Sequence, residues 1–206
     1  MEPVTPTPAQ ERELDRVGAF SDGVFAIAIT LLVLNIDVPH VPGSDLGAAI
    51  SDLSGDFVAY GIGFAVIGLF WYEHHALFSS LGRTTGRLVL VNTMLLASIG
   101  LMPFTTAVLG RYDQPLAVAL YAINVAVTTL LAGLIRVVAI TEHLSLEPPT
   151  ESQQARQRAA IVGAAGRALV FLLSIPIAYF ISESLAKWFW LLLLLVRTDR
   201  RRRPPV

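Results

Sequence analysis

The sequence predicts an all-α, polytopic membrane protein with six transmembrane helices. Hydrophobic residues make up 54% of the 206 residues and charged residues only 15%, whereas a soluble domain usually carries about 25% charged residues. Apolar runs near the roughly 20 residues that a helix needs to cross a bilayer recur along the chain. The charged residues lie between these runs. This composition argues against an ordinary water-soluble enzyme.

Five runs are long enough to cross a bilayer, and we predict one helix for each: 17–36, 57–79, 88–109, 115–140 and 159–181. The first run is not interpreted as a cleaved signal peptide. The segment before it is polar, acidic and proline-rich rather than basic, and no small-residue cleavage site follows it.

A sixth, shorter run covers 185–196, with Glu183 and Lys187 at its start. At 1.5 Å per residue, its uncharged part is shorter than a hydrocarbon core of about 30 Å. We predict that it crosses the membrane, starting inside the preceding run after Pro176 or spanning a thinned region. A half-inserted helix is the alternative.

The basic residues give the orientation. With six helices and the N-terminus inside, 13 of the 15 Lys and Arg residues face the cytoplasm and only Arg111 and Lys187 face outward, as the positive-inside rule requires. We therefore expect a cytoplasmic segment at 1–15, a six-helix membrane domain at 16–197 and a basic cytoplasmic tail at 198–206.

The first apolar run carries an apolar stripe. Ile27, Thr30, Leu31 and Leu34 follow i, i+3, i+4, i+7 spacing and share one helix face. Such a stripe usually contacts lipid or other helices, but a ring of stripes around an axis forms a hydrophobic constriction that gates by dewetting. Asn35 and Asp37 follow, next to an outer loop without Lys or Arg. These two residues would form a mouth that attracts cations.

The same run opens with four residues that match an Arg-x-x-x-Phe-Ser-Asp signature: Arg16, Phe20, Ser21 and Asp22. On this signature and the apolar run ending at Leu34, the chain resembles the transmembrane protein 175 family, specifically its single-repeat prokaryotic members. This resemblance implies a potassium-permeable channel in the plasma membrane of a prokaryote. It further implies a homotetramer in which the first helix of each subunit lines a central pore.

Carried onto this sequence, the resemblance places the pore constriction on Ile27, Leu31 and Leu34, with Thr30 as a polar layer. The signature residues would form a structural network that holds the first helix against its neighbours. The expected partners are a second, third and fourth copy of the chain, the lipid bilayer and permeant monovalent cations, K⁺ above all. No cofactor and no bound metal are expected.

Trp71, His74 and His75 lie near the predicted inner end of the second run and are candidates to join this network. We expect one histidine to bond Asp22 or Ser21; a pH-sensing role is the alternative, because histidine titrates near neutrality. Adjacent histidines point about 100° apart on a helix and are poor joint metal ligands.

Three further features are assigned to packing. Ala59 and Gly63 form a small-xxx-small pair that lets helices approach closely. Asn92 and Asn124 are expected to form interhelical hydrogen bonds. Arg136 and Arg167 are expected to snorkel toward the inner interface.

Other function classes lack residues to support them. The chain has no cysteine, no phosphate-binding glycine loop, no nucleophile elbow and no catalytic carboxylate pair, so we predict no enzyme activity. A net charge of −1 gives no pull toward nucleic acid. The alternatives to a channel are a secondary carrier of a small cation or solute, and a membrane scaffold without transport.

Overall fold

The computed structural model describes residues 6–146, 150–183, 185, 186 and 190. The elements are α1 Pro8–Val33, the 3-10 turn η1 Gly43–Asp45, α2 Leu46–Asp52, α3 Ser54–Phe78, α4 Gly86–Arg111, α5 Pro115–Thr141 and α6 Glu151–Phe180. In the described part of the chain, α1 and α3 to α6 are long and apolar enough to cross a membrane. The prediction of an all-α membrane protein is confirmed, and a helix long and apolar enough to span a membrane covers most of each of the first five predicted runs.

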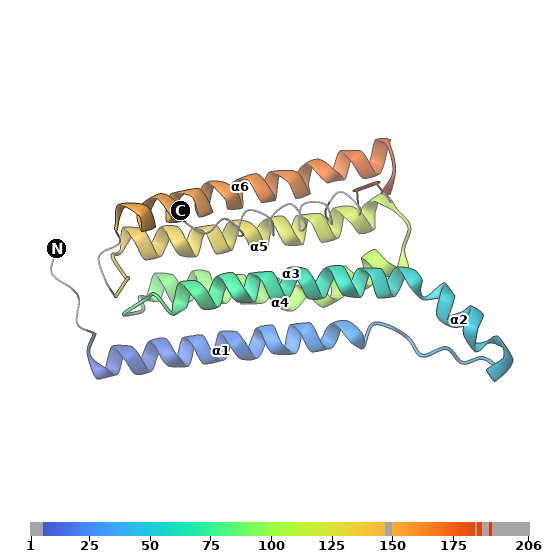
Figure 1. Cartoon of the computed structure of the whole chain (residues 1–206), viewed down its shortest axis with the longest axis horizontal. Coiled ribbons are helices and arrows are strands. Elements are labelled where there is room, and N and C mark those ends of the chain that lie inside the picture. Colours follow the sequence, from blue (N-terminus) through green and yellow to red (C-terminus); the bar gives the residue numbers. More distant parts are fainter. Residues whose placement is uncertain (1–5, 147–149, 184, 187–189, 191–206) are drawn as a thin grey trace, which may run out of the picture.

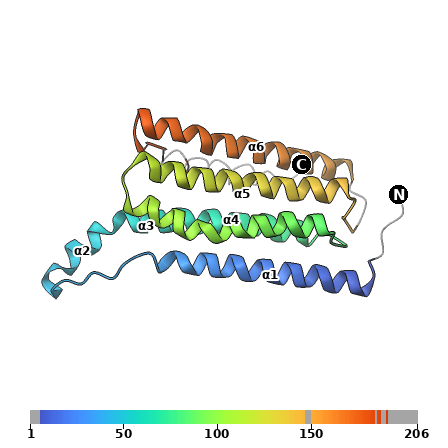
Figure 2. The same cartoon turned by 180° about the vertical axis from the view of Figure 1, so that it is seen from behind.

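The five long helices run side by side in one bundle (Figure 1). α1 lies at one edge and packs against α3 and α4, whereas α5 lies between α4 and α6, and α6 forms the opposite edge. The view from behind gives the same order (Figure 2). The short helix α2 extends beyond the bundle at the end where α1 stops. α1 is therefore a peripheral helix with one side free of the described chain.

Threonine side chains start three of these helices. Thr7 and Thr150 each accept a hydrogen bond from the backbone N–H three residues later, and a glutamine at that position completes a capping box. Thr85 accepts in the same way from the backbone N–H of Leu88. Because the caps lie in polar sequence, α1 and α6 begin nine and eight residues before the predicted membrane spans, at Pro8 and Glu151.

Small residues set the distance between α3 and its neighbours. A Cβ atom on Gly63 would lie 2.9 Å from the Thr106 side chain on α4 and 3.1 Å from Leu32 on α1. A Cβ atom on Gly110 would lie 3.1 Å from Ala59. The small pair at Ala59 and Gly63 therefore lies where helices approach closely, as predicted.

The segment after α6 returns to the bundle at two described positions. Ala186 and Trp190 are buried, and the Trp190 ring lies 5.3 Å from the rings of both Tyr121 on α5 and Phe171 on α6. Most of the predicted sixth span and the basic tail lie outside the described residues. A sixth crossing therefore stays a prediction.

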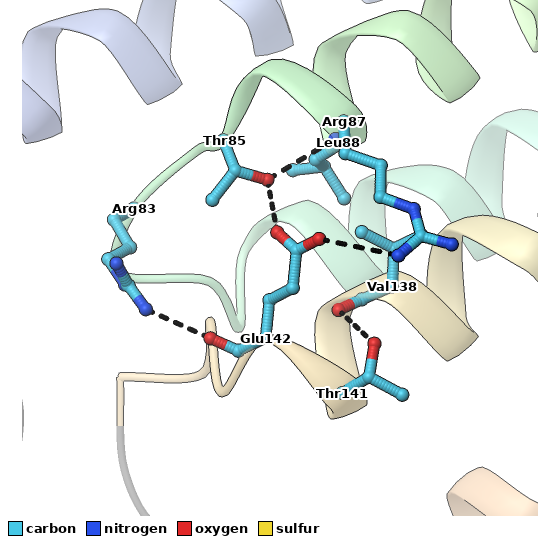
Figure 3. Close-up of polar contacts among 7 residues, drawn as sticks. All are labelled: Arg83, Thr85, Arg87, Leu88, Val138, Thr141 and Glu142. Atoms are coloured by element: carbon cyan, nitrogen blue, oxygen red, sulfur yellow. Dashed lines mark hydrogen bonds and ion pairs between the residues drawn. The ribbon is translucent and has the colours of Figure 1, made fainter.

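A polar cluster joins two connections at the end of the bundle where α1 begins (Figure 3). Glu142, at the end of α5, accepts from Thr85 Oγ1 through its carboxylate at 2.6 Å and from Arg83 through its backbone carbonyl at 2.9 Å. Arg87 lies 3.9 Å from the same carboxylate. We call these four residues the Glu142 cluster. It connects the α3–α4 turn to the end of α5.

Backbone hydrogen bonds reinforce this connection. The N–H of Gly82 donates to the carbonyl of Leu144 at 2.8 Å, and the N–H of Leu146 donates to the carbonyl of Ser80 at 3.1 Å. These bonds form an isolated antiparallel bridge between the α3–α4 turn and the α5–α6 connection. The two turns are therefore held as one unit.

Candidate functional site

α1 has two different faces. Ser21, Phe25, Ala28 and Leu32 are buried against the neighbouring helices. The predicted constriction residues lie on the other face, where the exposed fractions of Ile27, Leu31 and Leu34 are 60%, 42% and 73%. Thr30 is exposed beside them. We call Ile27, Thr30, Leu31 and Leu34 the free stripe, because the described chain leaves all four uncovered.

The hydroxyl of Thr30 is already bonded inside α1. Thr30 Oγ1 donates to the carbonyls of Ala26 and Ile27 at 3.1 and 2.9 Å. A hydroxyl oxygen keeps acceptor lone pairs when its hydrogen is donated. Thr30 therefore presents an oxygen acceptor within an otherwise apolar stripe.

A buried hydrogen-bond chain holds the first half of α1 to α3 and α4. Asn92 Nδ2 on α4 donates to Ser21 Oγ at 3.0 Å, and Ser21 Oγ donates to the carbonyl of Val17 at 2.8 Å. Asn92 Oδ1 lies 2.9 Å from His74 Nε2 on α3. Because that Asn92 oxygen can only accept, this arrangement requires His74 to donate from Nε2.

Aromatic side chains pack around this set of hydrogen bonds. The His74 ring lies 4.1 Å from the Phe78 ring and 5.4 Å from the Phe25 ring of α1. Next to these hydrogen bonds, Trp71 Nε1 donates to Asp22 Oδ1 at 2.9 Å, and the Trp71 ring stacks on His75. α1, α3 and α4 therefore meet at the last two signature residues, Ser21 and Asp22, and at Phe25 just after them.

The structure corrects part of the predicted network. The expected direct bond from a histidine to Asp22 or Ser21 is wrong: His74 reaches Ser21 through Asn92, and Asp22 bonds Trp71. The reason is that α4 contacts both α1 and α3, so that its asparagine bridges them.

Arg16 and Phe20, the other two signature residues, are exposed. Both line a groove of ≈ 790 Å³ between α1 and α4. Within the described residues, Arg16 forms no hydrogen bond or ion pair. These two side chains are therefore free to contact another molecule.

At its other end, α1 is connected to α4 by two further contacts. Asn35 Nδ2 donates to the carbonyl of Pro103 at 3.1 Å. Asp37 Oδ2 lies 2.5 Å from Arg111 Nη2. Both residues of the predicted mouth thus contact α4, and the charge of Asp37 has a counter-ion. Sequence reasoning placed Arg111 on the outer side but did not pair it.

Two interhelical groups lie away from the free stripe. Asn124 on α5 donates to Thr105 Oγ1 and accepts from Ser98 Oγ, both at 3.1 Å. Asn92 and Asn124 therefore form the interhelical hydrogen bonds that the sequence predicted.

The second group connects Arg136 and Arg167, the two arginines expected to snorkel, to Glu73. Arg167 Nη2 lies 3.3 Å from Glu73 Oε2, and Arg136 Nη2 donates to the Glu73 carbonyl at 3.4 Å. These contacts connect α5 and α6 to α3. Charged side chains inside a membrane bundle are usually paired in this way.

The free stripe lies within the part of the chain that matches a known family. The model of the family described as "Endosomal/lysosomal potassium channel TMEM175" matches residues 16–103. A potassium channel of Streptomyces collinus is 44% identical over 101 residues, which are 48% of this chain and 49% of the relative. A potassium channel of Chamaesiphon minutus is 42% identical over 106 residues, 50% of this chain and 52% of the relative.

The human endosomal/lysosomal proton channel TMEM175 is 42% identical over 98 residues, 43% of this chain and 19% of that protein. The matched part of the chain therefore spans about half the length of the bacterial relatives.

Solved structures extend the likeness along the chain. The crystal structure of a lysosomal potassium-selective channel TMEM175 homolog from Chamaesiphon minutus superimposes with a TM-score of 0.77 at 27% identity, covering 93% of this chain and 100% of that chain. A variant of the potassium channel MtTMEM175 shares the fold with a TM-score of 0.64 at 22% identity, covering 90% and 91%. Sequence likeness thus covers the free stripe and its supporting helices, and fold likeness extends beyond them.

Proposed function

We propose that this chain belongs to the TMEM175 family, which its matches support, and that it forms a potassium-permeable cation channel with α1 as the pore wall. The observation that carries the proposal is the contrast between the two faces of α1. Its buried face packs against α3 and α4 and is hydrogen-bonded to α4 through Ser21, whereas Ile27, Leu31 and Leu34 are exposed. The curated bacterial relatives are named potassium channels, which supports K⁺ as the permeant ion.

One copy of α1 cannot enclose a pore, so several copies must surround a common axis. We propose a homotetramer in which the four free stripes face that axis. Ile27, Leu31 and Leu34 then form successive apolar rings, and Thr30 adds a ring of hydroxyl oxygens between them. A narrow apolar ring resists hydrated ions and closes by dewetting. The constriction is therefore expected to set both conductance and selectivity.

We further propose that the channel lies in the plasma membrane of a prokaryote with both termini in the cytoplasm. The distribution of Lys and Arg supports this orientation. The Asn35 end of α1 then faces outward, and the Glu142 cluster faces the cytoplasm.

The alternatives make different demands on the helices. A secondary carrier usually has broken helices and charged groups near the membrane midplane. The free stripe has no charged residue, and α1 is continuous from Pro8 to Val33. A scaffold would leave the stripe in contact with lipid. Unitary currents in single-channel recordings separate a channel from a carrier, and cation flux separates either from a scaffold.

The test is cation flux from liposomes that contain the purified protein, with K⁺, Na⁺ and Cs⁺ compared. We expect the flux of K⁺ to exceed the flux of Na⁺. Ile27→Asn and Leu34→Asn should raise conductance severalfold or reduce the preference for K⁺, because a polar ring removes the dewetting barrier.

Leu169→Asn is the matched control for this test. Leu169 is an equally apolar, 56% exposed residue on α6, and its substitution should leave conductance unchanged. Unchanged currents in both α1 variants would remove α1 from the pore wall.

A further inference from the structure

The outer end of α1 is acidic, but its first acid is paired. Residues 35–56 contain four aspartates and no Lys or Arg. Asp37 is the aspartate nearest in sequence to the free stripe, three residues after Leu34. Its carboxylate pairs with Arg111, the last residue of α4, at 2.5 Å. The positive charge near the exit of α1 thus comes from another helix.

The fold holds this pair beside the exit of the free stripe. Asn35 donates to the carbonyl of Pro103, eight residues before Arg111 on the same helix, which fixes the end of α1 against α4. Both charged side chains remain in contact with solvent, with exposed fractions of 76% for Asp37 and 51% for Arg111. An exposed ion pair contributes at most about 1 kcal/mol to stability. Its main consequence is therefore the local electric field.

We propose that Arg111 sets the conductance of the channel by neutralising Asp37 at the pore mouth. This inference rests on the proposed function, because the free stripes must surround an axis for four such pairs to surround the same mouth. With the pairs intact, the mouth gains little attraction for K⁺ from Asp37. Removing Arg111 would expose four carboxylates, and removing Asp37 would expose four guanidinium groups.

The expected size of the effect follows from Coulomb's law. Four unit charges, each about 10 Å from a cation in water, change its local concentration about five- to tenfold at ~10 mM salt. At ~1 M salt, where charges are screened over about 3 Å, the change is below about 1.5-fold. Dependence on salt therefore separates an electrostatic role from a structural one.

The experiment records single-channel K⁺ currents of the full chain in planar bilayers at about 10 mM and 1 M KCl. Arg111→Gln should raise conductance severalfold at low salt, and Asp37→Asn should lower it by a similar factor. The double variant should return to within about twofold of the wild type, because it restores a neutral mouth. All differences should disappear at high salt and should depend on the salt on one side of the bilayer only.

Two controls separate charge from other effects. Arg111→Lys keeps the charge and should conduct as the wild type does. Asp52→Asn removes an equal charge from α2, which extends away from the bundle, and should change conductance little. Thermal melts of the variants should lie close to that of the wild type, because the pair is exposed.

The outcomes are distinct. Equal conductance of Arg111→Gln and the wild type at low salt would overturn the inference while leaving the proposed function intact. A change that persists in 1 M KCl, or that also occurs in Arg111→Lys, would assign Arg111 a structural role and overturn it too. A wild-type protein that passes no K⁺ at any voltage would overturn the proposed function and, with it, this inference.

Discussion

α1 and α5 are apolar helices of nearly equal length, with 26 and 27 residues, but they are buried in the bundle to different extents. In the most apolar part of α5, 61% of the residues are buried, against 22% in α1. The polar side chain of Asn124 on α5 bonds α4 inside the bundle, whereas among the described residues Thr30 on α1 bonds only the backbone of its own helix. Hydropathy alone does not distinguish a core helix from a peripheral one.

The difference lies in where the interhelical bonds fall along each helix. α1 is bonded to its neighbours near Ser21 and Asp22 and again near Asn35 and Asp37. The free stripe lies between these two groups of contacts. α1 is therefore held firmly while its stripe stays uncovered, which is the arrangement expected of a wall that several copies share.

The largest expected effect tests whether the uncovered face of α1 meets another copy. The chain has no cysteine, so a single substitution gives a unique thiol. Ile27→Cys should form a disulfide-linked dimer on oxidation in liposomes, because facing stripes around an axis bring equivalent residues together. The readout is the fraction of dimer on a non-reducing gel.

Leu130→Cys on α5 is the control, since Leu130 is 51% exposed on the outer surface of a central helix. It should remain monomeric under the same conditions. Equal cross-linking at the two positions would mean that the free stripe has no special relation to a second copy.

A smaller effect distinguishes the two faces of α1 through adjacent leucines. Leu32 is 1% exposed and Leu31 is 42% exposed. Leu32→Ala should lower the free energy of unfolding by about 2–3 kcal/mol, because it leaves a cavity between helices. Leu31→Ala should cost less than about 1 kcal/mol and should act on ion flux instead. Thermal melts in detergent and flux assays on the same samples measure both quantities.

A large loss of stability in Leu31→Ala, with flux unchanged, would place the stripe in a packing interface rather than in a pore wall.

The smallest effect concerns how closely α1 approaches α3. Gly63→Ala should destabilise the protein by about 1–2 kcal/mol, because the new Cβ would lie 2.9 Å from Thr106 and 3.1 Å from Leu32. Gly61→Ala is the control: nothing lies within 4 Å of its added Cβ. It should be neutral or stabilising by a few tenths of a kcal/mol, because alanine favours the helix. Chemical denaturation of both variants measures the difference in their free energies of unfolding. Equal values would argue against close packing at Gly63.

Much of the fold could be predicted from the sequence because span length and apolar composition are local properties. The five described spans were predicted in this way. The starts of α1 and α6 were not, because both helices continue into polar sequence from the capping boxes at Thr7 and Thr150. The glutamine three residues after each threonine is a signal that could have located these starts. The short helix α2 has no comparable pattern and was not predicted.

The candidate site was predictable in part for the same reason. The free stripe follows from helical spacing within eight residues, and the structure leaves those residues exposed. Its role in a pore stays a prediction. The partners that hold α1 could not be identified from local sequence, because Ser21 and Asn92 are 71 residues apart and Asp37 and Arg111 are 74 apart. Their pairing depends on how α4 packs beside α1.

The Glu142 cluster has a mechanical consequence for the opposite end of the molecule. It fixes the start of α4 to the end of α5, so a tilt of α4 would pivot at that end like a lever. With 26 residues, α4 is about 39 Å long. A rotation of about 5° would swing its far tip by about 3 Å. Asp37 pairs with Arg111 at that tip, and Asn35 bonds Pro103 in the same half of α4. A movement too small to disturb the pivot would thus be magnified at the other surface of the membrane.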